Sequence, residues 1–214
     1  MLELGLKVFI SYLIGSLNGS LIIGRMSGVD IRAVGSGNAG GTNALRTQGK
    51  MFAFWVMLID VGKGSLPIWL LPALSLPWLD PDPEISRGWL TYAIGGAAIV
   101  GHCYPVWFRF AGGKGAATAI GVLLVIAPLL LLPAGITWIL VLSISGYVGL
   151  ATISAAVVIP VCIAFMTLPN GLNLLMFTAM LAAFIVFTHR SNIQLILSGD
   201  EDRDMQSSWL GRRR

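Results

Sequence analysis

The sequence predicts an all-α integral membrane protein with seven transmembrane helices, and this prediction rests on composition and on patterning. The chain of 214 residues is 56% hydrophobic and only 11% charged, whereas soluble domains usually carry about 25% charged residues. The apolar residues come in long blocks without an amphipathic pattern, as bilayer-spanning helices require. We therefore expect one membrane domain that covers residues 1–214.

The first three predicted spans are separated by polar loops and cover residues 4–23, 51–76 and 89–108. In the first span, Ser11, Gly15 and Gly19 are four residues apart, and such a ridge of small residues lets a neighbouring helix approach closely. The second span carries Asp60 and Lys63. Because these two residues are three apart, they share a helical face and can pair. Ionisable residues within a span are often functional, but a purely internal ion pair is an equally good interpretation.

The stretch from Gly115 to Thr188 contains no Asp, Glu, Lys, Arg or His, so hydropathy alone does not show how many spans it holds. The charges of the flanking loops give the orientation of the chain, and the orientation limits that number. The basic loops after the first and third spans predict the cytoplasmic side, and the acidic segment 77–87 suits the outside. The basic C-terminal tail also suits the cytoplasm, which requires an even number of spans in between. Two spans would be far too long, so four are expected, at 116–132, 134–148, 152–168 and 171–188. The expected breaks between them are Pro133–Gly135, Ser143–Gly149 and Pro169–Gly171. This arrangement places the N-terminus outside and the C-terminus in the cytoplasm.

The loop after the first span contains a glycine-rich run from Gly35 to Arg46. Glycines let consecutive backbone N–H groups converge on one point, and the resulting concavity attracts anions. Arg46 offers a guanidinium fork suited to phosphate, and a helix that starts near Thr42 would add its positive end. Side-chain donors in the run are Ser36, Asn38, Thr42 and Asn43. A flexible connector is the alternative interpretation, because Gly, Ser and Asn are common in ordinary turns.

A second glycine-rich loop, Gly112-Gly113-Lys114-Gly115, opens the fourth predicted span. A glycine turn with one lysine at the start of a helix can bind phosphate or a carboxyl phosphate. For this loop alone, a cytoplasmic anchor with glycine turns is the slightly better interpretation. Two such loops on the same face of the membrane nevertheless indicate two phosphorylated ligands, because one phosphate needs only one cradle.

Two histidines, His102 and His189, lie at the ends of predicted spans. A lone histidine in such a position is more often structural than catalytic, and His189 also fits an interfacial cap. Neither has the residue spacing of a metal centre, and no serine–histidine–acid triad is visible. Cys103 and Cys162 lie far apart in different apolar blocks, which gives no disulfide framework. We therefore expect no metal ion and no cofactor.

In their order along the chain these motifs resemble the three cytoplasmic motifs of the PlsY family, the bacterial acyl-phosphate:glycerol-3-phosphate acyltransferases. The matching segments are Ser36–Asn43, Gly101–His102 through Gly112–Gly115, and His189–Ile193, and Asp60–Gly64 resembles a further family element. The resemblance implies transfer of a fatty acyl group from acyl phosphate to the 1-hydroxyl of glycerol 3-phosphate. The products would be lysophosphatidic acid and inorganic phosphate, in the first acylation step of bacterial phospholipid synthesis. It also implies a multi-pass enzyme of the bacterial inner membrane whose active site faces the cytoplasm.

The resemblance further assigns roles to individual residues. It gives catalytic roles to Ser36, Asn38, His102 and Asn192. Substrate-binding roles fall on Gly37, Thr42, Asn43, Arg46, Lys63, Gly112, Gly113, Lys114, Gly115 and His189. The family often has serine where Gly149 stands and arginine where Leu195 stands, so contacts from these two positions are expected to be missing or replaced. The expected partners are acyl phosphate and glycerol 3-phosphate as substrates, membrane lipid, and the enzyme that makes acyl phosphate, without nucleic acid.

A transporter or channel for a phosphorylated metabolite is the rival class of function. Transporters commonly show repeated halves and polar groups near the membrane midplane. Here no convincing internal repeat is found, and most polar residues cluster at one predicted boundary, which favours chemistry at the cytoplasmic surface. A structural scaffold, the third class, leaves the two phosphate-like loops unexplained.

Overall fold

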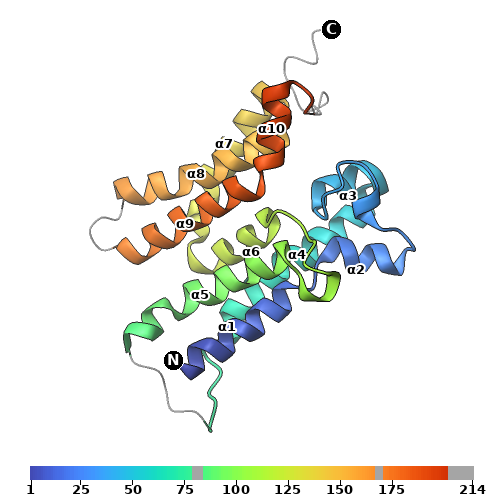
Figure 1. The fold of residues 1–214 in the computed structure, drawn as a ribbon. Helices are drawn as coiled ribbons and strands as arrows, with labels where there is room; N and C mark the ends of the chain where they lie inside the picture. The colour runs from blue at the N-terminus through green and yellow to red at the C-terminus, as the bar shows by residue number, and fades with distance from the viewer. Residues whose placement is uncertain (79–83, 167–170, 202–214) are drawn as a thin grey trace. The chain divides into compact units, whose positions relative to one another are not determined.

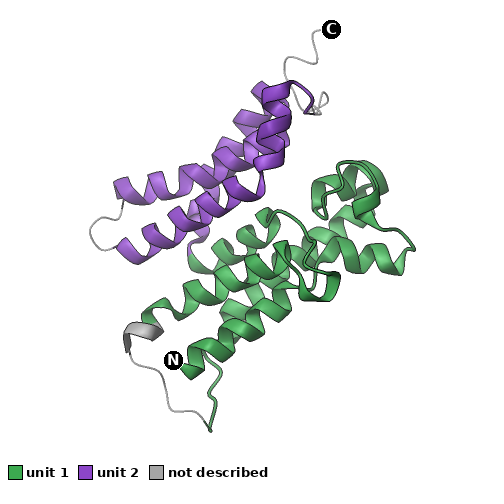
Figure 2. Ribbon diagram, in the orientation of Figure 1, with its two compact units in different colours: residues 1–126 green, residues 127–214 purple. Residues whose placement is uncertain are grey.

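The computed structural model describes residues 1–78, 84–166 and 171–201, apart from the side chains of residues 84–87. Its described residues form helices and no strands, which confirms the all-α prediction. The chain forms two compact units, residues 1–126 and residues 127–214 (Figures 1 and 2). The single membrane domain, the number of spans and the orientation of the termini stay predictions.

Unit 1 is built around two pairs of packed helices, α1 against α5 and α4 against α6. The shorter helices α2 and α3 pack on α4. The helices are α1 (Leu2–Gly15), α2 (Gly19–Met26), α3 (Gly41–Gln48), α4 (Lys50–Leu70), α5 (Glu84–Cys103) and α6 (Ala116–Ile126), with short 3-10 helices η1 (Ile31–Ala33) and η2 (Val106–Phe108).

The predicted first span consists of two helices, because α1 and α2 meet at a bend of 43°. Asn18 lies in the bend and caps α2, where its Oδ1 accepts the N–H of Leu21 at 3.2 Å. Ser11 and Gly15 of the small-residue ridge lie on α1 and face α5 closely, whereas Gly19 begins α2 and meets Val56 of α4. Ser11 donates to the carbonyl of Ile94 at 2.7 Å, and a Cβ on Gly15 would overlap the backbone of Ala98.

The third predicted span, residues 89–108, is shorter in the structure because α5 ends at Cys103. Pro105 disfavours helical backbone in Tyr104 before it, and residues 106–108 form η2 instead. The second predicted span also ends earlier than expected, since α4 stops at Leu70. Residues 79–83 of the predicted outer loop lie outside the described residues.

Unit 2 contains η3 (Pro128–Leu130), α7 (Leu131–Ser145), α8 (Val148–Met166), α9 (Leu172–Thr188) and α10 (Arg190–Ser198). Helix α8 packs against both α7 and α9 (Figure 1), and α9 and α10 meet at a bend of 52°. The chain breaks at Ala127 rather than at the expected Pro133–Gly135. Pro133 lies in the first turn of α7, where a missing N–H costs no hydrogen bond.

The other two expected breaks of this charge-free stretch have different outcomes. Within 143–149, Gly146 has a φ of 75° and ends α7, in the left-handed region that suits glycine. The break expected at 169–171 lies largely outside the described residues, and α9 begins at Leu172 after it.

Three described helical segments are long and apolar enough to cross a membrane: α4, residues 128–145 and α8. The number rises to five when each bent pair, α1 with α2 and α9 with α10, is taken as one span. Helix α6 is apolar but only 11 residues long. Large apolar side chains are also exposed along these helices, for example Trp69 in α4 and Phe165 in α8, as expected where lipid replaces water.

Candidate functional site

The first glycine-rich loop is folded around the side chain of Asn43, which is 2% exposed. Its Oδ1 accepts the N–H of Ser36 at 3.0 Å. Gly35 and Gly37 have φ of 56° and 70°, and these turns suit glycine alone. The Nδ2 of Asn43 donates at 3.0–3.1 Å to three carbonyls of the loop, those of Ile31, Val34 and Asn38. The Asn43 amide is therefore occupied by the backbone of its own loop, which it holds in shape.

The predicted phosphate ligands of this loop lie around the start of α3. The helix begins at Gly41, close to the start near Thr42 that the sequence allowed. Gly40 precedes it without a side-chain cap, so the N–H groups of the first turn have no capping oxygen. Ser36, Thr42 and Arg46 are exposed and Asn38 is half-buried. The loop thus presents hydroxyl, guanidinium and backbone donors at the positive end of a helix.

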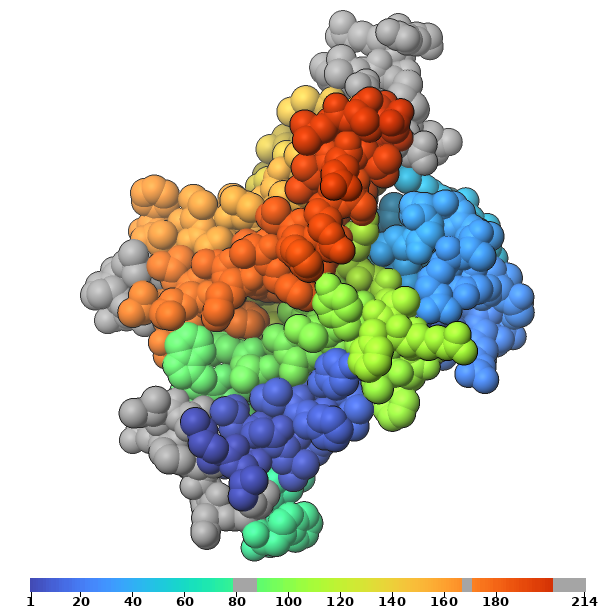
Figure 3. Space-filling model, viewed as in Figure 1, coloured from blue at the N-terminus to red at the C-terminus, as the bar shows by residue number. Residues whose placement is uncertain are grey.

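The second glycine-rich loop is tied to the end of α5. The N–H of Gly112 donates to the carbonyl of Cys103 at 3.1 Å, and the N–H of Gly113 to that of His102 at 3.2 Å. Lys114 is half-buried, and Gly115, with a φ of 90°, leads into α6. Figure 3 shows the segment that contains this loop at the surface of unit 1, beside the end of α1.

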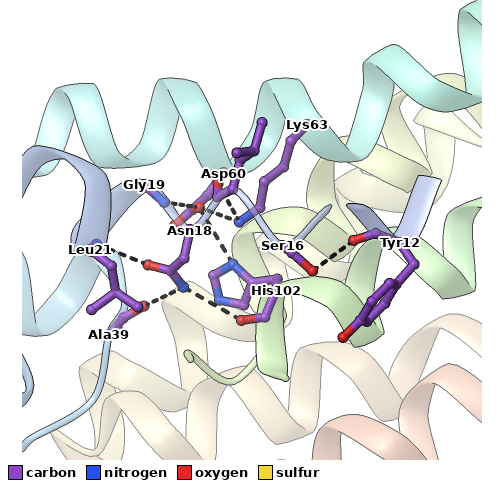
Figure 4. Close-up of polar contacts among 10 residues, drawn as sticks. Tyr12, Ser16, Asn18, Gly19, Leu21, Ala39, Asp60, Lys63 and His102 are labelled. Atoms are coloured by element: carbon purple, nitrogen blue, oxygen red, sulfur yellow. Dashed lines mark hydrogen bonds and ion pairs between the residues drawn. The ribbon is translucent and has the colours of Figure 1, made fainter. Parts of the chain in front are cut away.

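The two loops meet at Gly113. A Cβ at this position would overlap Nε2 of His102 and would lie 2.6 Å from the carbonyl oxygen of Ala39, in the first loop. Asn18 spans the same place, since its Nδ2 donates to the carbonyls of Ala39 at 3.3 Å and His102 at 3.5 Å (Figure 4). The bend between α1 and α2, the end of α5 and both glycine-rich loops are therefore packed together at a single point.

A buried ion pair lies behind this point. Lys63 Nζ is 2.8 Å from Asp60 Oδ1, which confirms that the two residues pair across one turn of α4. The same oxygen accepts the N–H of Gly19 at 2.9 Å, and Lys63 Nζ donates to the carbonyl of Leu17 at 3.1 Å. Asp60 and Lys63 are 0% and 5% exposed. Their partners lie on both sides of the α1–α2 bend, so the pair holds that bend in place.

His102 connects the ion pair to the loops. The side chain is 2% exposed, and its Nδ1 lies 3.4 Å from Asp60 Oδ1. Its Nε2 lies against Gly113. Figure 4 shows the imidazole beside the buried carboxylate. The ring therefore lies between Asp60 and Gly113 of the second loop, a placement that suits positioning of the loop.

The two remaining candidates, His189 and Asn192, belong to unit 2. His189 is 5% exposed and caps α9, with its Nδ1 2.8 Å from the carbonyl of Ile185. Because a carbonyl only accepts, this contact assigns the ring hydrogen to Nδ1. On α10, Asn192 Nδ2 donates to Glu201 Oε1 at 2.6 Å.

The two positions that depart from the family pattern both bear on α10. A Cβ at Gly149 of α8 would lie 2.8 Å from Cβ of Asn192, so a serine here would push the two helices apart. Leu195 is exposed, but its carbonyl accepts the N–H groups of Asp200 at 2.8 Å and Glu201 at 3.1 Å. This turn brings the Glu201 carboxylate back to Asn192.

Asn18 is absent from the site predicted from sequence, and Asp60 was considered there only as one half of an ion pair with Lys63, although both help to position the loops. The signal for Asn18 is its place within the segment Ser16-Leu17-Asn18-Gly19-Ser20, a polar interruption of an apolar block. Polar residues inside a span are costly unless they bond. Within the described ranges, no group of three or more His, Cys, Asp or Glu side chains could hold a metal ion.

The sequence is similar to those of known glycerol-3-phosphate acyltransferases. The family model for glycerol-3-phosphate acyltransferase matches residues 6–199. A glycerol-3-phosphate acyltransferase of Albidiferax ferrireducens is 39% identical over 201 residues, which cover 91% of this chain and 86% of the relative. One of Geotalea daltonii is 41% identical over 192 residues, which cover 90% of this chain and 93% of the relative.

Solved structures show the same similarity. The crystal structure of PlsY, an integral membrane glycerol 3-phosphate acyltransferase, in its glycerol 3-phosphate form matches with a TM-score of 0.80 and 33% identity, over 94% of each chain. Its lysophosphatidic acid form matches with a TM-score of 0.78 and 32% identity, again over 94% of each chain. From its motifs, its relatives and its fold, the chain belongs to the PlsY family of integral membrane glycerol-3-phosphate acyltransferases.

Proposed function

We propose that this protein transfers a fatty acyl group from acyl phosphate to the 1-hydroxyl of glycerol 3-phosphate, and releases lysophosphatidic acid and inorganic phosphate. The observation that carries the proposal is the meeting of two glycine-rich loops at Gly113 in a chain of the PlsY family. The PlsY forms with glycerol 3-phosphate and lysophosphatidic acid support the acceptor and the product. The choice of acyl phosphate as donor is supported by the resemblance of the motifs.

Two phosphorylated substrates need two places that attract anions, and unit 1 offers two neighbouring ones. The first is the start of α3, where Ser36, Thr42 and Arg46 are exposed. The second is the start of α6, where Lys114 and Gly115 precede the first turn. Both helix N-termini add positive field to the donors beside them. The roles that the resemblance gives to His189 and Asn192 in unit 2 are part of the proposal.

The chemistry we propose is direct attack of the 1-hydroxyl oxygen on the acyl carbonyl carbon. The carbon–oxygen bond to phosphate then breaks, and phosphate is a good leaving group, so no acyl-enzyme is needed. Ser36, Asn38 and nearby loop N–H groups stabilise the developing oxyanion, while Arg46 and Lys114 hold phosphate groups and align the reactants. Detection of acylated Ser36 in quenched reactions would contradict direct transfer.

The hydroxyl proton goes to the departing phosphate in this proposal. His102 is the other candidate acceptor, but its ring is 2% exposed and lies between Asp60 and Gly113. A general base has to reach the proton that it removes. We therefore assign His102 the task of holding Gly113 and the second loop in place.

We also propose that the enzyme lies in the bacterial inner membrane with both glycine-rich loops facing the cytoplasm. Arg25, Arg32, Arg46 and Lys50 flank the first loop, and Arg109 and Lys114 belong to the second, which agrees with retention of positive charge inside. The acyl chain then enters from the lipid. The enzyme that makes acyl phosphate is the partner that supplies the donor.

Replacing Ser36 with alanine tests the proposed function. The Ser36 hydroxyl is exposed, and the loop is held through the Ser36 N–H instead, so the fold should persist. Loss of one oxyanion donor should lower the rate of phosphate release from palmitoyl phosphate by about 10²–10³-fold. Ser27→Ala is the control, because Ser27 is also exposed and follows the last residue of α2. Wild-type turnover by Ser36→Ala would show that the first loop does not supply this donor.

Replacing Glu201 with alanine should lower the KM for glycerol 3-phosphate severalfold and leave kcat unchanged. The Glu201 carboxylate holds the Asn192 amide at 2.6 Å, a charge-assisted bond that competes with a substrate phosphate. Steady-state kinetics over a range of glycerol 3-phosphate concentrations measure the effect. Asp200→Ala, which removes the neighbouring exposed carboxylate, should leave KM unchanged. Equal KM values for wild type and Glu201→Ala would show that this bond does not compete with substrate.

A further inference from the structure

We propose that Arg32 is a positioning residue for acyl transfer. Arg32 lies before the first glycine-rich loop, and its side chain holds the turn 108–111, which comes directly before the second glycine-rich loop. We call this contact the clasp. The inference rests on the proposed function, because the clasp acts on the loop that carries Lys114. It assigns no contact with substrate to Arg32. The proposal accounts for two hydrogen bonds from Arg32, to residues that lie 76 and 79 positions further along the chain.

The Arg32 guanidinium is oriented by Asp30, the residue that caps η1. Asp30 Oδ1 accepts the backbone N–H of Arg32 at 3.0 Å. The same oxygen accepts Nε of Arg32 at 3.0 Å, and Oδ2 accepts Nη2 at 2.9 Å. These hydrogen bonds to Arg32 hold the pKa of the Asp30 carboxyl below its usual range, so it is ionised at neutral pH. One edge of the guanidinium is thus fixed, and Nη1 is directed away from Asp30.

The Nη1 group reaches the turn before the second loop. It lies 3.3 Å from the carbonyl oxygens of both Phe108 and Ala111. Between these carbonyls are Arg109 and Phe110, each with a φ of 58°, the two non-glycine residues of the described chain with positive φ. Left-handed backbone is unfavourable for residues with a Cβ and persists only where the surroundings hold it. The N–H groups of Phe110 and Ala111 hold the turn from within, by donating to the carbonyls of Pro105 at 2.9 Å and Phe108 at 3.3 Å. Arg32 adds a hold from outside the turn, because its Nη1 carries two hydrogens for two carbonyls.

The position of this turn controls the position of the second loop. Ala111 is followed directly by Gly112 and Gly113, which bond to the end of α5, and then by Lys114. Asp30 and Arg32 are 50% and 33% exposed, and an ion pair of that kind contributes little to folding stability. We therefore expect loss of the clasp to impair catalysis through the loop and to leave the fold intact.

The test compares Arg32 variants of the full-length protein in lipid, with palmitoyl phosphate and glycerol 3-phosphate. Arg32→Ala should reduce kcat by roughly tenfold to a hundredfold, the scale of a small misplacement of substrate-holding groups. Arg32→Lys keeps the charge but lacks the planar fork needed for Asp30 and two carbonyls together, so it should show a similar loss. Arg25→Ala is the matched control, because Arg25 is exposed in the last turn of α2. This control should keep the wild-type rate.

A rescue separates positioning from general damage. Phe110→Gly relieves the cost of positive φ, so it should restore most of the rate in the Arg32→Ala background and change the wild-type rate little. Wild-type rates in Arg32→Ala or Arg32→Lys would overturn the clasp, and so would the absence of rescue by Phe110→Gly. If Arg32→Ala does not fold, the same rescue is measured by comparing the rates of Arg32→Lys with and without Phe110→Gly. Failure of the proposed function is distinguishable, because then the wild-type protein itself shows no turnover.

Discussion

Gly113→Ala should reduce the rate of acyl transfer by about a hundredfold, with little change in the amount of folded protein. The added methyl group would overlap Nε2 of His102 and lie 2.6 Å from the carbonyl oxygen of Ala39. Neither neighbour can yield freely, because His102 is packed against Asp60 and Ala39 is held by Asn18. One of the two loops therefore has to move, and a displacement of about 1 Å in groups that align substrates costs on the order of 10²-fold in rate.

The matched control for this substitution is Gly96→Ala in α5. A Cβ at Gly96 meets nothing within 4 Å, and alanine favours helix more than glycine does. Initial rates of phosphate release, with circular dichroism to check helix content, give the comparison. Equal rates for Gly113→Ala and Gly96→Ala would mean that the meeting of the two loops is unimportant for catalysis.

Asp60→Ala should destabilise the folded protein by about 3–5 kcal/mol, the usual cost of removing one partner of a buried ion pair. The substitution leaves the Lys63 ammonium buried without its carboxylate, and it removes the acceptor of the Gly19 N–H. The bend between α1 and α2 then loses its contact with α4 at Gly19. Unfolding by denaturant in detergent micelles, followed by tryptophan fluorescence, measures the change in free energy.

A double variant tests whether the pair acts as a unit. The double variant Asp60→Ala with Lys63→Met has lost both charges, so its free energy of unfolding should be higher than that of Asp60→Ala alone. Additive effects of the two substitutions would make the double variant the less stable one. Asp30→Ala is the control, because the Asp30–Arg32 pair is exposed and should contribute no more than about 1 kcal/mol. Additive losses in the double variant would show that Asp60 and Lys63 stabilise the protein independently.

The sequence predicted the features that depend on local pattern. Long apolar blocks gave the all-α membrane class, and the spacing of Asp60 and Lys63 gave their pairing. The glycine-rich run allowed a helix start near Thr42, and α3 begins at Gly41. In each case the information lies within a few residues of the chain, where periodicity and helix-start signals act.

Features that depend on distant contacts were not predictable in this way. Asn43 belongs among the predicted phosphate ligands, but its amide is taken up by loop carbonyls that only the folded chain brings to it. Asn18 donates to the carbonyls of Ala39 and His102, which lie 21 and 84 positions further along the chain. No local pattern specifies such partners. The break at Ala127 was placed too late in the sequence because Pro133 fits the first turn of α7 as well as it fits a loop.

The central claim is tested most directly by supplying purified protein with palmitoyl phosphate and glycerol 3-phosphate and measuring both products. The account predicts phosphate and lysophosphatidic acid in equal amounts, and no lysophosphatidic acid when palmitoyl-CoA replaces palmitoyl phosphate. The contradictory result is absence of turnover with palmitoyl phosphate together with uptake of glycerol 3-phosphate into proteoliposomes. In that case the glycine-rich loops would bind phosphate for transport, and acyl transfer from acyl phosphate would be refuted for this protein.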